Sequence, residues 1–479
     1  RVYIGVQVKD PLAVRIRYKT RLIQSKYEGS PVKQTLAALL AATGALAFGY
    51  TIGYSSPAIP DMIKHGVLTV PESPVFGSLM TVGALVGGPL GGWFVEKNGR
   101  KMTILFASFP FILGWLAIAY QLSNSYTYMY GGRLLTGVAS GMITVCVPVY
   151  IAEISSKAYR GVLGTLTQLL ITIGILAVYV LGSYIGWSGL ALIGALSGIF
   201  IIIGAFFLPE SPHWLLKQGK KAEAIESLKA LRDAHMDVGE ECRDIEEGID
   251  VKESVPLSEF LKPELFKPLL IIVFIMFFQQ FSGINAVMFY TVNIFEKAVP
   301  SLAHSATIGI GVVQVIGTFV AAQLMDRAGR RKLLIFSGLT MAISLFGMAY
   351  YFHYEAAWIA DGMKTSWLPV ISLMLFVIGF SLGWGPIPML VMSEILPVRV
   401  KGTASAIAIF SNWSFAFAVT LSFIPAQMLI GPSLVFCIFG AACFISVCFV
   451  LRFLPETKGK SLEDIELFFL GKSPITPIV

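Results

Sequence analysis

Twelve apolar segments, separated by short polar stretches, run along the chain. A helix that crosses the hydrocarbon core of a bilayer needs about 20 consecutive, mostly apolar residues. Segments of this kind lie near residues 35–56, 73–95, 102–121, 127–150, 162–184, 187–208, 268–290, 304–325, 333–353, 367–392, 402–424 and 432–454. The pattern predicts an all-α membrane protein with twelve transmembrane helices.

The polar stretch in the middle of the chain divides these segments into two sets of six. We expect a cytoplasmic N-terminal segment over 1–34, a six-helix bundle over 35–208, a cytoplasmic helical linker over 209–267, a second six-helix bundle over 268–454 and a cytoplasmic tail over 455–479. In the linker, an amphipathic helix is predicted with Ala222, Ile225, Leu228 and Leu231 on one side. The linker acts either as a lid beneath a pore or as a passive tether.

Three charged motifs occur twice, in the same order, at the ends of apolar segments. Glu96-Lys97-Asn98-Gly99-Arg100-Lys101 returns as Asp326-Arg327-Ala328-Gly329-Arg330-Arg331, Glu153 with Arg160-Gly161 returns as Glu394 with Lys401-Gly402, and Pro209-Glu210-Ser211 returns as Pro455-Glu456-Thr457. A repeat of this kind is typical of transporters built from two related bundles. It predicts two pseudo-symmetric halves that move against each other.

Composition and charge support a membrane location. Hydrophobic residues make up 55% of the chain and charged residues 14%, whereas a soluble domain has about 25% charged residues. The net charge is +7, but only Lys64, Lys297 and Lys364 of the 36 Lys and Arg fall in the loops assigned to the outside. The positive-inside rule therefore puts both termini in the cytoplasm. We expect a multi-pass protein of the plasma membrane rather than of endosomes or lysosomes, with the lipid bilayer and no nucleic acid as partners.

No pattern typical of an enzyme is present. The five cysteines lack metal-ligand spacing, and the chain contains neither a nucleophile elbow nor a phosphate-binding loop. We therefore expect no catalytic residue, no metal and no cofactor.

Seven short strings carry a resemblance to a known family. They are GGRLLTG (131–137), PVYIAEISSKAYRG (148–161), PESPHWLL (209–216), QQFSGINAVMFY (279–290), DRAGRRK (326–332), GWGPIP (383–388) and PETKGKSLEDIE (455–466). Through them, the chain from about residue 33 to 470 resembles the sugar porters of the major facilitator superfamily. It looks closest to animal facilitative hexose transporters of class III and to arthropod trehalose transporters. The resemblance implies transport of a hexose such as glucose, or a disaccharide such as trehalose, by alternating access, for which a monomer suffices.

Six amide side chains lie inside otherwise apolar segments, namely Gln168, Gln279, Gln280, Asn285, Gln314 and Asn412. Amides both donate and accept hydrogen bonds, which suits the hydroxyls of a neutral sugar. Because a polar side chain in hydrocarbon costs free energy, the set favours a water-filled cavity, although each amide alone could be an interhelical hydrogen bond. Ser282-Gly283 offers a helix break that would bring Asn285 toward the paired glutamines.

The resemblance places the same amides around the sugar, together with Trp413. This indole either stacks on the apolar face of a pyranose or packs as an ordinary aromatic side chain. The resemblance also identifies Phe289 and Tyr290 as an extracellular gate. Two expected site residues depart from the family pattern. Met389 stands where a tryptophan is usual, and Ser381 stands where hexose facilitators often have a carboxylate or another polar group.

The repeated charges resemble the intracellular salt-bridge network of the family. Such a network bridges the two halves in the outward-open state and parts in the inward-open state; alternatively, the charges only fix topology and helix ends. Its members here are Arg100, Glu153, Arg160, Glu210, His213, Asp326, Arg330, Glu394, Lys401 and Glu456. His213 stands where the family usually has arginine, which predicts a pH-sensitive conformational bias.

The first apolar segment bears on proton coupling. Proton-coupled members of the family carry an aspartate in a motif like FGYD, whereas this chain reads Phe48-Gly49-Tyr50-Thr51. No Asp or Glu occurs from Thr35 to Pro60. We therefore expect a uniporter. The alternatives are a proton-coupled symporter, a channel, or a sugar sensor without transport, although sensors carry longer tails than the two dozen residues expected here after the last helix.

Overall fold

A computed structural model describes residues 31–120, 126–156, 159–232, 238–247, 262–360, 367–397, 400–458, 460, 465 and 468–469. Residues 1–30 of the segment expected over 1–34, most of the tail over 455–479, and Lys364 lie outside the described residues, whereas residues 31–34 already belong to the first helix. The described part contains twelve helical stretches that are long and apolar enough to cross a membrane, which confirms the predicted number of spans.

Each of the first six spans is one helix. They are α2 (Pro31–Lys64), α3 (Ser73–Asn98), α4 (Arg100–Tyr120), α5 (Tyr126–Ile154), α6 (Arg160–Leu181) and α7 (Trp187–Phe207). Several are longer than the apolar segments that predicted them. The first span runs over 32–64 rather than 35–56, because the helix continues past Ser55 and Ser56 through the apolar residues Ile59, Met62 and Ile63.

Two of the last six spans are broken. The seventh consists of α11 (Pro263–Phe281) and α12 (Ile284–Ala298), and the tenth of α15 (Leu368–Leu382) and α16 (Ile387–Ile395). The others are α13 (Ala303–Ala328), α14 (Arg330–Ala360), α17 (Lys401–Ile430) and α18 (Pro432–Phe453). Gly283 ends α11 with a left-handed φ of +83°, which few residues other than glycine adopt readily.

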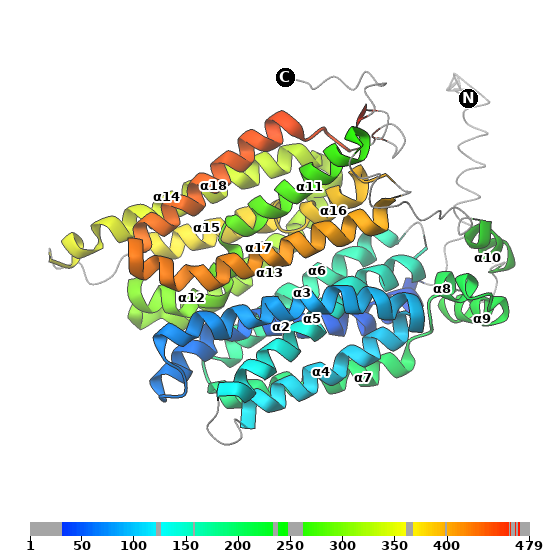
Figure 1. Cartoon of the computed structure of the whole chain (residues 1–479), viewed down its shortest axis with the longest axis horizontal. Helices are drawn as coiled ribbons and strands as arrows, with labels where there is room; N and C mark the ends of the chain where they lie inside the picture. Colours follow the sequence, from blue (N-terminus) through cyan, green and yellow to red (C-terminus); the bar gives the residue numbers. More distant parts are fainter. Residues whose placement is uncertain are drawn as a thin grey trace, which may run out of the picture.

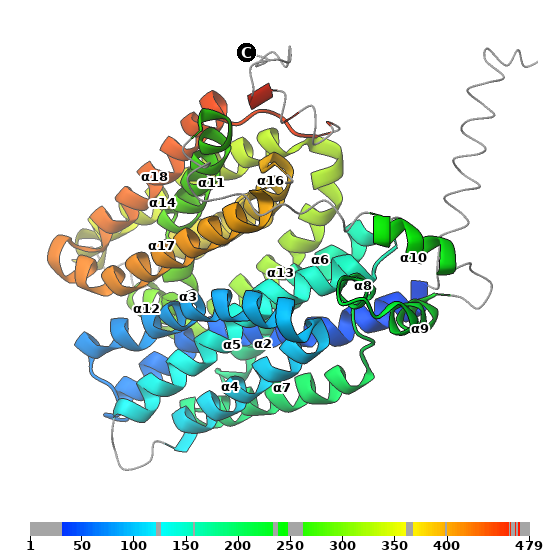
Figure 2. The ribbon, with the colours of Figure 1, turned by 45° about the vertical axis from the view of Figure 1, so that its right-hand side comes forward.

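The spans form two groups that lie side by side, with α2–α7 in one half and α11–α18 in the other (Figures 1 and 2). The short helices α8 (Pro212–Lys217), α9 (Lys221–Leu231) and α10 (Val238–Glu247) lie together at one end of the molecule, beside the first half. We call this end, which includes Arg100 and Arg330, the linker end. The opposite end, which includes Lys64 and Lys297, is the far end.

The linker helices are attached to the first half. The guanidinium of Arg232 is almost fully buried; it pairs with Glu241 at 2.6 Å and donates to the Ile154 carbonyl at 2.9 Å. The predicted amphipathic helix is present as α9, with Leu228 and Leu231 buried as expected. Its predicted face was wrong at Ala222, which is exposed, because the buried stripe follows the 224, 228, 231 spacing of a 3.6-residue period.

Glycines allow close helix packing in the first half. A Cβ at Gly87 would overlap the Val138 carbonyl oxygen of α5, so these two helix backbones are in direct contact. The next residue, Gly88, would place a Cβ where no atom lies within 4 Å. Adjacent glycines of one helix therefore have opposite roles: one is required by packing and the other is not.

We predict that Gly87→Ala lowers the thermal midpoint of the purified protein in detergent, because overpacking costs about 1–3 kcal/mol. Gly88→Ala is the matched control and should leave the midpoint unchanged or raise it, since alanine is the better helix former by about 1 kcal/mol. Equal midpoints for the two variants would contradict the packing assignment.

Candidate functional site

Four of the six amides form one chain of hydrogen bonds. Asn285 donates to the Gln280 amide oxygen at 2.6 Å, and Gln280 donates to the Asn412 oxygen at 3.1 Å. Asn412 donates to the Gln279 oxygen at 2.8 Å, and Gln279 donates to the Trp384 carbonyl at 2.8 Å. Gln279, Gln280 and Asn412 are each at most 7% exposed. The structure thus brings together amides that are up to 133 residues apart.

Two helix breaks make this chain possible. The left-handed turn at Gly283 lets Asn285, at the start of α12, reach back to Gln280 near the end of α11, as the sequence suggested. The second break, between α15 and α16, frees the Trp384 and Gly385 carbonyls that Gln279 contacts at 2.8 and 3.2 Å. An amide has two N–H donors and an oxygen with two lone pairs, so the chain retains capacity for hydroxyl groups.

Gln168 and Gln314 lie on α6 and α13, where the two halves touch. A Cβ at Gly311 would lie 3.2 Å from the Leu176 Cα, so the two helices are in close contact there. At 1.5 Å per residue, Gln314 lies roughly 5 Å and Gln168 roughly 12 Å from this contact, both toward the linker end. The pair is therefore positioned on either side of the interface between the halves.

Two buried oxygens beside this interface have no hydrogen-bond partner among the described residues. They are the amide oxygen of Gln314, a residue 5% exposed, and the hydroxyl of Ser381, a residue 3% exposed. Ser381 packs against α13, since a Cβ added to Gly317 would lie 2.9 Å from the Cβ of Ser381. Most buried polar atoms are hydrogen-bonded, so these two unpaired oxygens favour a polar ligand beside α13.

Trp413 and Met389, which were also expected to line the sugar site, differ in their burial. Trp413 is half-buried on α17 and contacts Phe48 of the first half edge-on, with ring centroids 6.1 Å apart. Met389, on α16, is 42% exposed and lies outside the packed core. The structure thus places Trp413 next to the amide chain through Asn412, and leaves Met389 more open.

Phe289 and Tyr290 lie between the halves at the far end and are at most 1% exposed. The Tyr290 ring stacks on Phe423 at 5.5 Å, and its hydroxyl lies 3.5 Å from the Ser73 carbonyl of the first half. A Cβ at Gly77 of α3 would approach the same hydroxyl to 2.8 Å. In this structure the two predicted gate residues are therefore buried in the contact between the halves at the far end.

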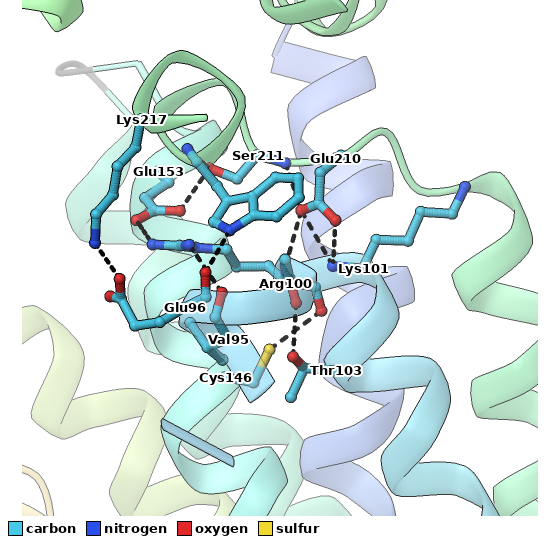
Figure 3. A network of polar contacts seen from close by, with 12 residues as sticks. Val95, Glu96, Arg100, Lys101, Thr103, Cys146, Glu153, Glu210, Ser211 and Lys217 are labelled. Carbon is cyan, nitrogen blue, oxygen red and sulfur yellow. Dashed lines mark hydrogen bonds and ion pairs between the residues drawn. The ribbon is translucent and has the colours of Figure 1, made fainter. Parts of the chain in front are cut away.

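The repeated charges form a compact cluster in the first half (Figure 3). Arg100 pairs with Glu153 at 2.7 Å, and its backbone N–H donates to the Glu210 carboxylate at 2.9 Å. Glu210 thereby caps the start of α4, where a Cβ on Gly99, at φ +90°, would overlap its carboxylate. Burial raises the pKa of the Glu210 carboxyl, although the backbone N–H groups that it accepts from act in the opposite direction.

The second half repeats this arrangement. Arg330 pairs with Glu394 at 2.9 Å, its backbone N–H donates to Glu456 at 3.0 Å, and Gly329 has a φ of +88°. Thr457 donates to Glu394 as Ser211 donates to Glu153. The ion pair and the capping glutamate of each cluster thus lie within one half, where they hold the ends of several helices together.

The remaining predicted members of the network are Arg160, His213, Asp326 and Lys401. Arg160 is exposed at the start of α6. Asp326 lies on α13 and Lys401 begins α17, but their side chains lie outside the described part. His213 of α8 is half-buried, and its Nδ1 has no hydrogen-bond partner among the described residues.

Arg133 is a buried cation to which the sequence analysis assigned no role. It lies on α5 with 0% exposure and donates to the Thr51 carbonyl at 3.2 Å and to the Ser55 hydroxyl at 2.8 Å. The rings of Tyr54 and Phe76 lie 5.8 and 5.3 Å from its guanidinium. In the part of the chain that the structure describes, no carboxylate pairs with it. A lone arginine within an apolar span was the available signal, because such residues are rare and functional.

A family model described as "Sugar (and other) transporter" matches residues 37–469. The chain belongs to this sugar transporter family. The sugar transporter ERD6-like 6 of Arabidopsis thaliana is 40% identical over 92% of this chain and 91% of its own length. The facilitated glucose transporter member 8 of solute carrier family 2 from Mus musculus is 38% identical (91% and 94%), and the facilitated trehalose transporter Tret1 of Apis mellifera ligustica is 39% identical (92% and 90%).

Solved structures of the proton:xylose symporter XylE show the same fold. The complex with 6-bromo-6-deoxy-D-glucose is 24% identical, with a TM-score of 0.76 over 91% of this chain and 99% of that chain. A partially occluded inward-open form from E. coli gives the same TM-score and identity over 90% and 100%. The resemblance to sugar porters of the major facilitator superfamily is confirmed, and this sugar transporter is an integral membrane protein and not an enzyme.

The site around His213 generates a pH prediction. The pKa of His213 is lowered from its usual value, and burial of the imidazole is the largest cause. The charges of Glu153 and Glu241 raise this pKa, whereas those of Arg160 and Arg100 lower it. His213 is therefore neutral at pH 7, and the stability that its burial gives to the docked α8 is lost as the pH falls below the usual value of about 6.5.

We predict that the rate of sugar exchange changes on acidification from about pH 7.5 to about pH 5, through the histidine range. In His213→Arg the charge is permanent, so the pH profile should become flatter. His353→Arg, at an exposed position of α14, is the control and should keep the normal profile. An unchanged profile in His213→Arg would show that another group is responsible.

Proposed function

We propose that this sugar transporter is a facilitative uniporter that moves a neutral sugar down its gradient by alternating access. The observation that carries the uniport assignment is the environment of Arg133. Its hydrogen-bond acceptors are the Thr51 carbonyl and the Ser55 hydroxyl, neither of which takes up a proton near neutral pH. Proton coupling requires a group in the pathway that changes charge during the cycle, and Thr51 stands where a carboxylate would supply it.

The amide chain supports a neutral, hydroxyl-rich substrate. Gln280, Asn285 and Asn412 have no formal charge, so they offer hydrogen bonds without the desolvation cost of an ion. A hexose such as glucose and a disaccharide such as trehalose both fit this chemistry, and relatives at 38–39% identity carry these two sugars in their names. The open position of Met389 and the small Ser381 favour a wider pocket than a tryptophan and a longer side chain would leave.

We also propose that the linker end faces the cytoplasm. The basic residues of the linker and of both charged motifs lie at this end, whereas few Lys or Arg are assigned to the far end. The closed gate at Tyr290 is then the outer one. Residence in the plasma membrane rather than in endosomes or lysosomes stays a prediction.

In this orientation, the linker-end charges control the inner opening. We expect residues of the two charged clusters to bridge the halves when the linker end closes. A partly exposed ion pair contributes about 0–1 kcal/mol. Several such pairs together supply the few kcal/mol that set a two-state population without locking it.

The test is uptake of labelled glucose, fructose and trehalose into liposomes, with and without an imposed proton gradient. A uniporter should equilibrate its sugar to the same level in both conditions. Accumulation above the outside concentration, driven by the gradient, would identify a symporter. Binding of a sugar without exchange of any sugar would identify a sensor.

We predict that Gln280→Ala and Asn285→Ala each weaken sugar affinity by about 2- to 12-fold, because one net hydrogen bond contributes about 0.5–1.5 kcal/mol. Equilibrium binding to the purified protein measures this effect, and thermal midpoints check that the variants are folded. Gln323→Ala, at an exposed position of α13, is the control. Unaltered affinity in both site variants would remove the amide chain from the binding site.

A further inference from the structure

Four polar contacts between the two halves end on α12, close to Tyr290. Tyr290 leaves the helical conformation, with φ −124° and ψ 20°, although α12 continues on both sides of it. In a regular helix, the Val292 N–H would donate to the Met288 carbonyl across this residue. The irregular turn at Tyr290 therefore lies between the two residues that this helical hydrogen bond would join, Met288 and Val292.

Both groups of that hydrogen bond are engaged by hydroxyls of the first half. Tyr179 of α6 donates to the Met288 carbonyl at 2.9 Å. Ser56 of α2 accepts from the Val292 N–H at 3.0 Å. The Thr291 hydroxyl, between these groups, lies 3.4 Å from the Tyr179 hydroxyl. Ser56 and Tyr179 are at most 1% exposed, so water does not compete for these contacts.

A buried backbone group without a partner costs free energy, and the cost is largest where no water is present. The contacts of α2 and α6 with α12 therefore stabilise the irregular turn at Tyr290. The same contact holds the Tyr290 hydroxyl near the Ser73 carbonyl, at 3.5 Å. Closure of the far end and distortion of α12 thus stabilise each other.

We propose that Ser56 and Tyr179 are positioning residues that hold the far-end gate closed by replacing the helical partners of Val292 and Met288. When the far end opens, α12 separates from both hydroxyls, and the turn from Met288 to Val292 re-forms its own hydrogen bond. Tyr290 then rotates away from α3. The irregular turn is the element with two arrangements that alternating access requires; this assignment rests on that proposed mechanism.

The hydrogen bonds at this gate join uncharged groups, so each contributes as much free energy as a typical neutral hydrogen bond. Loss of one such bond should raise the ratio of far-end-open to far-end-closed molecules about five-fold. Tyr179→Phe removes only the hydroxyl and keeps the ring in its packed position. Ser56→Ala removes the acceptor for Val292, and the double variant should shift the ratio further than either single change.

The experiment measures distances between spin labels by pulsed electron resonance, in liposomes, in a variant whose five cysteines are replaced. Lys64→Cys with Lys297→Cys reports the far end, and Gly161→Cys with Gly402→Cys reports the linker end; all four positions are exposed. Tyr179→Phe and Ser56→Ala should each increase the long-distance population at the far end about five-fold and decrease it at the linker end.

Matched controls come from the first half. Tyr50 donates to the Leu190 carbonyl at 2.8 Å within one half, so Tyr50→Phe removes a similar bond without touching the gate. Ser140→Ala does the same for a buried serine that bonds its own helix. If Tyr179→Phe does not give folded protein, Ser56→Ala against Ser140→Ala decides alone.

A far-end population in the gate variants that matches their controls, or that shifts toward closure, would overturn the gate assignment while leaving alternating access intact. The two failures are distinguishable. A wild type whose two ends give one unchanged distance each, with and without glucose or trehalose, would contradict alternating access itself.

Discussion

Every backbone N–H and C=O in the hydrocarbon region needs a partner, and the proposed functional parts of this transporter lie where a helix does not supply one. The break after α11 brings Asn285 to Gln280, and the break after α15 leaves the Trp384 carbonyl to Gln279. The irregular turn at Tyr290 takes its partners from the other half. The proposed sugar site and the proposed gate both lie at interrupted helices, which gather polar side chains.

The two halves share their linker ends but not their breaks. In each half, an arginine pairs with one glutamate while a second glutamate caps its helix, at Arg100 and again at Arg330. Charges suit this end, where water and lipid headgroups reduce the cost of an unpaired ion. The far end carries the exposed Lys64 and Lys297, but its buried contacts between the halves are made by neutral hydroxyls such as that of Tyr179.

Much of this was predictable from the chain. Twelve apolar segments gave twelve spans, and the glycine after Ser282 marked the break that joins Asn285 to Gln280. The linker face was misplaced at Ala222, because a period of three was read in place of 3.6. Arg133 was overlooked, since its partners are a carbonyl and a hydroxyl on another helix, and neither has a signature in sequence. Ser56 and Tyr179 resemble ordinary residues of an apolar helix for the same reason.

The sequence by itself determined the spans, the duplicated halves, the charged helix ends and the amide chemistry of a neutral-substrate site, because hydropathy and residue type act locally. Only the tertiary structure decided which amides bond to one another and which end is closed. It also decided that Arg133 has no described acid partner and that Met288 and Val292 are held by the opposite half. These depend on the distance between helices that are far apart in the chain, and that distance is set by packing.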